Sequence, residues 1–161
     1  MLASGSAEEQ MHAVQDIAFI NRRPVRRALI EIVLDNAAPL GLRERATEML
    51  HLHSCRETAE ACAKALADPN VNIRFWAAYT LGQIADKSSL REIIASALKE
   101  VLGDQEVAPG WWSVGREAQA SIVGLRDDPG ERERLRAEVR RILTDPKASA
   151  EDRRWAECYD Y

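Results

Sequence analysis

The sequence predicts an all-helical protein that folds as one domain over residues 1–161. Few segments alternate between apolar and polar residues, and Ala, Leu, Glu and Arg, which favour helices, dominate the chain. Several segments begin with a capping signal and then repeat apolar residues at helical spacing. A chain of 161 residues suits a single domain that buries roughly two thirds of its unfolded surface.

We expect nine helices, and several of their starts carry recognisable signals. The helices span residues 7–20, 24–35, 41–53, 55–67, 72–85, 89–102, 114–125, 130–144 and 150–158. Capping boxes, in which a serine and a glutamate bond to each other's backbone amides, are predicted for Ser6 with Glu9, Ser54 with Glu57, and Ser89 with Glu92. The eighth helix has Asp128 as an acidic cap, followed by Pro129 where its missing amide is not needed.

The helix expected over residues 72–85 has the most sharply divided surface. At 100° per residue its apolar stripe consists of Ile73, Ala77, Leu81 and Ile84. The opposite side carries Phe75, Tyr79 and Gln83, with Trp76 at its edge. Ala78 and Gly82 flank the stripe and are small enough to let another helix come close.

After the first helix, the helices form pairs with recurring features. The outer members end alike, at Leu34-Asp35, Asp68-Pro69, Gly103-Asp104 and Asp145-Pro146. The inner members align on Ala46, Ala77, Ala118 and Ala156, with apolar residues four positions away on either side of most of them. A pair with an apolar stripe on both sides cannot bury it alone, so we expect the pairs to stack. The inner-helix face opposite this seam would then line a concave groove.

Two inner helices resemble the inner helix of a HEAT repeat, in its bacterial short-repeat or lyase-type form. Residues 42–46 and 73–77 are similar to its V-R-x-x-A entry, with Arg43 and Arg74 at the arginine. The two later pairs depart from it, with Gly115 in place of the arginine and Asp152 in place of the apolar residue. The resemblance implies a right-handed α-α superhelix of about four helix pairs plus an N-terminal helix. A plain helical bundle is the alternative.

The groove side carries aromatic and arginine side chains, which are typical anchors of protein interfaces. The expected partner-binding residues are Arg45, Glu48, Phe75, Trp76, Tyr79, Gln83, Trp111, Trp112, Arg116 and Trp155. The loop over residues 103–113 is longer than the other turns, and its Pro109-Gly110 pair favours a turn. Two packing alternatives stay open: Trp76 and Trp155 wedge between neighbouring helices, and one of the adjacent tryptophans of the loop folds inward.

We therefore expect a non-enzymatic scaffold that binds another protein, with no cofactor. Small HEAT-like proteins of bacterial type also occur as immunity or regulatory partners of a cognate protein, which the resemblance makes a narrower possibility. The alternatives are a HEAT-like DNA-binding protein or DNA glycosylase, whose tryptophans are echoed here, and a phycobilin-lyase-like protein. The net charge of −4 argues against a strong sequence-independent nucleic-acid binder. We find no nucleophile elbow or phosphate-cradling glycine loop.

Two further clusters have ordinary explanations. Four arginines between Arg22 and Arg27 stand at a helix start, where the macrodipole disfavours cations. We expect acids of the first helix to compensate them, namely Glu8, Glu9 and Asp16, with an acidic partner or a phosphate as the alternative. His51 and His53 do not suggest a metal site, because side chains two apart on a helix point about 200° apart.

The remaining expectations concern location. The three cysteines do not form a disulfide framework, which predicts free thiols in a reducing cytosol. No apolar run approaches the ~20 residues of a membrane span, and no secretory signal is apparent, so we expect a cytoplasmic protein.

Overall fold

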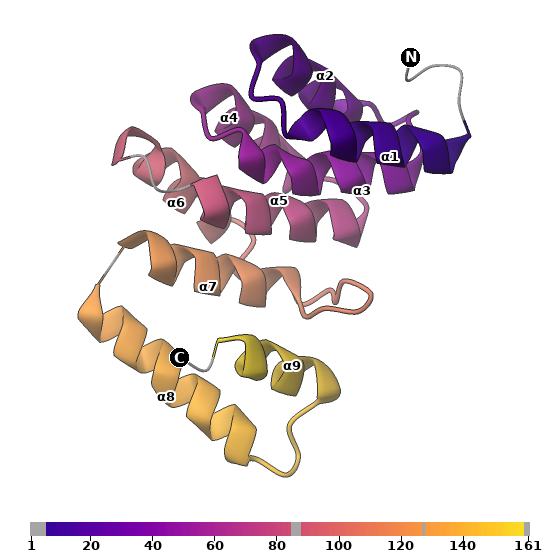
Figure 1. The fold of residues 1–161 in the computed structure, drawn as a ribbon. Coiled ribbons are helices and arrows are strands. Elements are labelled where there is room, and N and C mark those ends of the chain that lie inside the picture. The colour runs from indigo at the N-terminus through magenta and orange to yellow at the C-terminus, as the bar shows by residue number, and fades with distance from the viewer. Residues whose placement is uncertain (1–5, 85–87, 127, 160–161) are drawn as a thin grey trace.

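The computed structural model describes residues 6–84, 88–126 and 128–159, and these residues are all-helical apart from turns and one isolated β-bridge (Figure 1). The helices are α1 (Ala7–Ala18), α2 (Arg23–Leu34), α3 (Leu40–Met49), α4 (Arg56–Ala65), α5 (Val71–Ile84), α6 (Arg91–Lys99), α7 (Val114–Arg126), α8 (Pro129–Thr144) and α9 (Ala150–Cys158). Short 3-10 helices follow α3 and precede α6, namely η1 (Leu50–Leu52) and η2 (Ser88–Leu90). The all-helical prediction is confirmed for this part of the chain, where no helix has the length and apolar character needed to cross a membrane.

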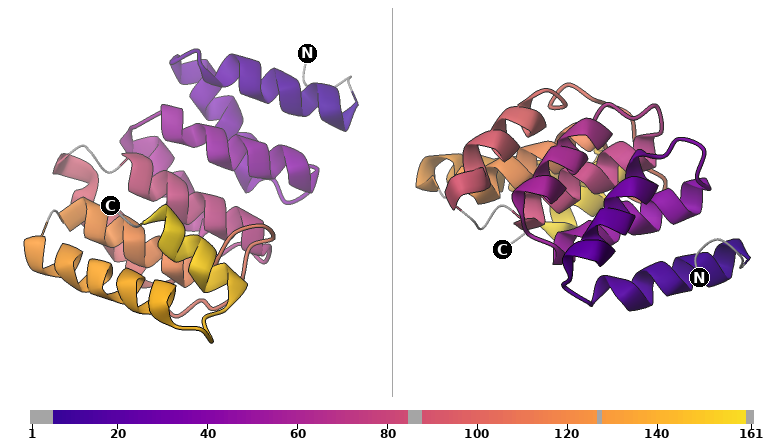
Figure 2. Two further views of the ribbon diagram at one scale, coloured as in Figure 1. Left: turned by 60° about the horizontal axis from the view of Figure 1, so that its bottom comes forward. Right: turned by 90° about the horizontal axis from the view of Figure 1, so that it is seen from above.

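The helices alternate between two rows. In the odd row α1 packs on α3, α3 on α5 and α5 on α7, while α2, α4 and α6 pack in sequence as the even row (Figures 1 and 2). Each even helix also packs on the odd helix that follows it, and α8 packs on α9 in the same way. The pairs expected from the sequence are therefore present.

Small residues set the spacing within the odd row. The aligned alanines Ala46, Ala77, Ala118 and Ala156 are all completely buried, as is the stripe of Ile73, Leu81 and Ile84 on α5. Gly82 meets α7 so closely that an added Cβ would lie 2.9 Å from the Cβ of Ser121. The predicted close approach of a second helix at Gly82 is confirmed, and its partner is α7.

Arginines near the start of the odd helices tie each pair together. Arg43 on α3 donates to the carbonyl oxygen of Val33 at the end of α2, at 3.0 and 3.1 Å. Its guanidinium also forms a buried ion pair with Asp68, which belongs to the next turn along the stack. One side chain therefore satisfies a carbonyl that the preceding helix leaves free and links two successive pairs.

The same arrangement recurs one pair further on. Arg74 on α5 donates to the carbonyl oxygen of Asp68 at 2.9 Å and forms an ion pair with Asp104 at 2.7 Å. On α9, Arg153 donates to the carbonyl oxygen of Asp145 at 2.6 Å. We call Arg43, Arg74 and Arg153, with the turn carbonyls and aspartates that they bind, the arginine ladder.

Gly115 on α7 interrupts this ladder for a steric reason. An added Cβ at Gly115 would lie 2.9 Å from the carbonyl oxygen of Asp104, so no side chain fits there. The backbone amide of Gly115 instead donates to that oxygen at 2.8 Å. At this position of α7, a backbone amide therefore makes the hydrogen bond that an arginine side chain makes in α5.

Two of the four predicted helix caps are correct. Ser6 and Glu9 form the capping box, and Asp128 accepts hydrogen bonds from the backbone amides of residues 130 and 131. The capping boxes predicted at Ser54 and Ser89 are wrong. The α4 helix begins after Cys55 with no side-chain cap, because the Ser54 hydroxyl donates to the carbonyl oxygen of Ile84 on α5. The α6 helix continues from the 3-10 turn η2 and likewise has no side-chain cap.

The basic start of α2 is compensated by a different acid from those predicted. Arg26 and Arg23 form ion pairs with Glu57 on α4, at 2.8 and 3.5 Å. The even row brings the starts of α2 and α4 together, which the sequence order alone did not indicate. The cysteines Cys55, Cys62 and Cys158 are free thiols, as predicted.

Gly82→Ala should destabilise the protein by about 1–3 kcal/mol, because the new methyl group overpacks the contact with Ser121. Gly124→Ala is the matched control, since a Cβ there meets nothing within 4 Å and removing a helical glycine should add about 0.5–1 kcal/mol. Urea unfolding monitored by circular dichroism measures both. Equal effects of the two substitutions would contradict the close contact of α5 and α7.

Arg43→Ala should cost about 3–5 kcal/mol of unfolding free energy, because it leaves the buried Asp68 carboxylate without its cation. Arg56→Ala serves as the control, because Arg56 forms an exposed ion pair with Glu60 one turn later. That change should cost less than about 0.5 kcal/mol. Chemical denaturation at neutral pH compares them, and a loss at position 43 as small as that at position 56 would show that the arginine ladder is not a major source of stability.

Candidate functional site

Aromatic side chains from α5 and from the loop before α7 form one continuous cluster, made of Phe75, Trp76, Tyr79, Trp111 and Trp112. The ring of Trp111 stacks on Phe75 at 5.6 Å and meets Trp76 edge-on at 5.4 Å. Tyr79 extends the cluster along α5 by an edge contact with Trp76 at 5.5 Å. We call these five residues the aromatic cluster, whose pair geometries are those that aromatic rings prefer.

The members of the aromatic cluster differ widely in exposure. Trp111 is 38% exposed, whereas Phe75 beneath it is only 1% exposed. The expectation that Phe75 faces the groove is therefore wrong, because the loop folds back and Trp111 covers it. Trp112 is buried, which confirms that one of the adjacent tryptophans folds inward. Trp76 and Tyr79 are half-buried.

Backbone hydrogen bonds hold the loop that presents Trp111. The amide of Trp111 donates to the carbonyl oxygen of Ala108 at 2.9 Å, and the amide of Ala108 donates to Trp112 at 3.2 Å. Gly110 adopts a φ of 85°, a left-handed conformation that glycine accepts without strain. From α9, Arg154 donates to the carbonyl oxygen of Trp111 at 3.1 Å. The exposed indole therefore stands on a well-supported turn.

Four of the predicted partner-binding residues converge on one hollow of about 260 Å³. Its lining consists of Met11, Gly41, Glu44, Arg45, Glu48, Asn72, Trp76, Pro109 and Trp111. These residues come from α1, α3, α5 and the loop, and none comes from the even row. We call this the aromatic hollow. It joins Arg45 and Glu48 of α3 with Trp76 of α5 and Trp111 of the loop, and these three segments lie far apart in the sequence.

The rim of the aromatic hollow is charged but internally balanced. Arg45 forms an ion pair with Glu48 at 2.7 Å. Asn72 donates to the Glu44 carboxylate at 2.7 Å. The hollow therefore combines a rigid aromatic wall with polar groups of both signs.

Two other predicted residues have structural roles. Trp155 on α9 is completely buried, so its expected place on the binding face is wrong and the packing alternative is confirmed for it. Arg116 lies 4.6 Å from the centre of the Trp155 ring and forms ion pairs with Glu138 and Asp152, the latter at 3.1 Å. A guanidinium stacked on an indole and paired with two carboxylates joins α7, α8 and α9.

Glu117 is the site residue that the sequence analysis missed. Its side chain is 2% exposed, and it accepts hydrogen bonds from the Trp112 indole N–H at 2.9 Å and the Tyr159 hydroxyl at 3.4 Å. Burial raises the pKa of Glu117 to about 7, and the hydrogen bonds from Trp112, Tyr159 and Ser121 act in the opposite direction. The sequence did contain one signal for Glu117. It precedes the aligned Ala118 just as Trp76 precedes Ala77, so it occupies the position equivalent to a predicted binding residue.

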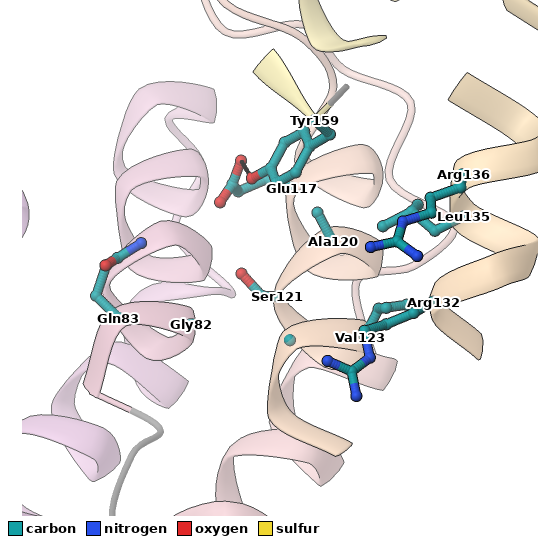
Figure 3. Close-up of a pocket in the computed structure, with 11 residues that line it drawn as sticks. Gly82, Gln83, Glu117, Ala120, Ser121, Val123, Arg132, Leu135, Arg136 and Tyr159 are labelled. Carbon is teal, nitrogen blue, oxygen red and sulfur yellow. Dashed lines mark hydrogen bonds between the residues drawn. The ribbon is translucent and has the colours of Figure 1, made fainter. Parts of the chain in front are cut away.

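A second cavity, of about 280 Å³, opens beside Glu117 (Figure 3). It is lined by Gly82, Gln83, Glu117, Ala120, Ser121, Val123, Gly124, Arg132, Leu135, Arg136 and Tyr159. We call it the Glu117 cavity. Gln83, which was predicted to share the binding patch with Trp76, lines this cavity rather than the aromatic hollow.

The two histidines near the end of α3 lie in different environments. The Nδ1 atom of His51 lies 2.6 Å from the carbonyl oxygen of Glu48. His53 is buried, and burial lowers the pKa of His53. Among residues 6–84, 88–126 and 128–159, no three His, Cys, Asp or Glu side chains are grouped as a metal site would require.

No protein-family model matches the chain, and no curated protein matches it significantly. The resemblance to HEAT repeats therefore stays a prediction based on the sequence.

Glu117→Gln should change how stability depends on pH. The folded protein holds the Glu117 carboxyl proton up to about pH 7, whereas the unfolded chain loses it near the ordinary pKa of 4.5, so stability falls as the pH rises between these values. Unfolding free energies measured by urea denaturation from pH 5 to pH 8 should show Glu117→Gln more stable than the wild type by roughly 3 kcal/mol at pH 8 and little changed at pH 5. A pH-independent difference would mean that Glu117 is ionised throughout.

Proposed function

We propose that the protein is a non-enzymatic scaffold that binds another protein through the face of its odd helices, with the aromatic hollow at the centre of the contact. In this proposal the two rows form a right-handed α-α superhelix of the HEAT type, and the odd row lines its concave side. The alternation of helices between two rows and the arginine ladder support that architecture.

The single observation that carries the proposal is that the Trp111 ring has one exposed face while its other face packs on buried aromatic residues. Its indole is 38% exposed, stacks on the buried Phe75 and stands beside Trp76. A large side chain that is already immobilised loses little conformational entropy when a partner covers it. Tryptophan in such a setting is a frequent energetic centre of protein interfaces.

The charges on the face of the odd helices favour a protein over a nucleic acid as the partner. Arg45 is paired with Glu48, and Arg116 is paired with Glu138 and Asp152. On the same row, Arg74 is paired with Asp104 and Glu106. Guanidinium groups that are already paired with carboxylates neutralise few phosphates, so they release few of the counterions condensed on a nucleic acid. A rim with charges of both signs suits a protein surface. An immunity or regulatory role toward one cognate protein is the narrower form of this proposal.

Trp111→Ala should weaken binding of the partner at least ~10-fold, the effect of removing an aromatic anchor worth ~1.4 kcal/mol or more. The partner is the protein that wild-type chain captures and that mass spectrometry identifies, and its affinity is then measured by calorimetry. Phe19→Ala is the matched control, because Phe19 is an aromatic residue of similar character that is 71% exposed at the end of α1, outside the hollow.

Equal binding of the partner to Trp111→Ala and to the wild type would contradict the assignment of the hollow. A salt-dependent mobility shift of DNA by the wild-type protein would favour the nucleic-acid alternative instead. Unchanged circular dichroism of both variants ensures that the comparison concerns binding rather than folding.

A further inference from the structure

The Glu117 cavity is separate from the aromatic hollow, with which it shares no lining residue. The α7 helix contributes Glu117, Ala120 and Gly124, which repeat at helical spacing and so lie on one face. The α8 helix contributes Arg132, Leu135 and Arg136 at the same spacing on the facing side, and α5 and Tyr159 complete the lining (Figure 3).

The lining has three chemically distinct parts. The buried carboxyl of Glu117 lies with the Tyr159 hydroxyl on one side. The side chains of Arg132 and Arg136 reach from α8 toward α7 (Figure 3). Apolar surface is supplied by Ala120, Val123 and Leu135. A few polar groups on a mostly apolar wall are what small-molecule sites generally present.

The charges around the cavity favour an anion. Two guanidinium groups and one carboxyl are the charged groups among the described lining residues, so cationic groups outnumber anionic ones in the lining. Arg136 lies 3.9 Å from Glu133, at the long limit of an ion pair, and both side chains are at least half exposed. This weak pair costs little to exchange for a ligand anion, and a guanidinium binds carboxylate or phosphate oxygens in a bidentate manner.

We propose that the Glu117 cavity binds a small organic anion, in which a carboxylate or phosphate group pairs with Arg132 and Arg136 and an apolar body carries a hydrogen-bond donor to Glu117. The Glu117 oxygen is held in place by the Trp112 indole and the Tyr159 hydroxyl, so the acceptor is positioned before a ligand arrives. The Gln83 amide and the Ser121 hydroxyl are the other uncharged polar groups of the lining.

Two features suggest that the cavity is a built site rather than a packing defect. Burial raises the pKa of the Glu117 carboxyl, and the folded protein loses stability once this carboxyl is ionised. A glutamine at this position would give a more stable protein. Perturbed carboxyls that combine burial with specific partners and an adjacent cavity are common at functional sites. A Cβ added at Gly124 would meet nothing within 4 Å, so the cavity wall is left open where a larger side chain would fit.

The test uses 4-aminobenzoate and 4-aminophenyl phosphate as probes, because each joins an anion to an apolar ring and an amine donor. Binding is followed by the NMR signal of the Trp112 indole N–H, which donates to Glu117. We expect saturable binding of at least one probe with a dissociation constant of about 1 mM or tighter, a value reasonable for so small a ligand. Aniline, which lacks the anion, should bind at least ~10-fold more weakly.

Arg132→Gln/Arg136→Gln should weaken the probe at least ~10-fold. Arg134→Gln/Arg140→Gln is the matched control, because it removes the same charge from exposed positions of the same helix outside the cavity lining, and binding should be unchanged. The proposal is overturned if neither probe binds, if aniline binds as well as the anions, or if both double variants weaken binding equally. Trp111→Ala should leave probe binding intact, so this test and that of the partner-binding face fail independently.

Discussion

The arginine ladder determines how each helix pair is set against the next. A helix leaves its last carbonyl groups without partners inside the helix, and a buried end must find donors elsewhere. Arg43 supplies such a donor to Val33 at the end of α2, and Arg74 donates to the carbonyl oxygen of Asp68 in the turn after α4. Their guanidinium groups also form ion pairs with the carboxylates of Asp68 and Asp104. Buried charges are tolerated only when they are paired and hydrogen-bonded, so each arginine requires both of its partners in place.

The ladder holds the starts of α3, α5 and α9, and the Gly115 amide replaces it at α7, so equivalent positions of these helices align. The residue before each buried alanine is Arg45 on α3, Trp76 on α5, Glu117 on α7 and Trp155 on α9. Equivalent positions of the four helices thus have different roles. Arg45 and Trp76 line the aromatic hollow, whereas Glu117 is a buried acid and Trp155 packs in the core. The difference in burial comes from what lies over each position. Glu117 is contacted by Trp112 and Tyr159, and Trp155 is contacted by Arg116 and Tyr159. Arg45 and Trp76 instead border the aromatic hollow.

Features that depend on periodicity within a helix could be predicted from the sequence. The buried faces of Ile73, Ala77 and Leu81 follow from helical spacing alone, and the close approach at Gly82 follows from the absence of a side chain. Pairing of the helices also followed from recurring turn residues. Such features are local, and local patterns are the reliable part of a sequence interpretation.

Features that depend on contacts between segments distant in the sequence could not be predicted. A helical wheel places Phe75 opposite the seam, but it contains no information about Trp111, which covers that ring from a loop far along the chain. The role of Glu117 was missed because its side chain is held by Trp112 and Tyr159, which lie outside its helix. Ser54 matched a capping box, yet its hydroxyl found a partner on α5. In each case a tertiary contact overrode a correct local signal.

Trp112 connects the two candidate sites, and its position separates their roles. Its ring contacts Phe75 at 5.8 Å and Trp111 at 5.5 Å, while its indole N–H donates to Glu117. One side chain therefore supports both the base of the aromatic cluster and the acid of the Glu117 cavity. A substitution there would disturb both at once, whereas the residues that face outward belong to one site each, Trp111 to the hollow and Arg136 to the cavity. Partner binding and anion binding, as proposed, thus share a rigid wall but depend on different exposed side chains.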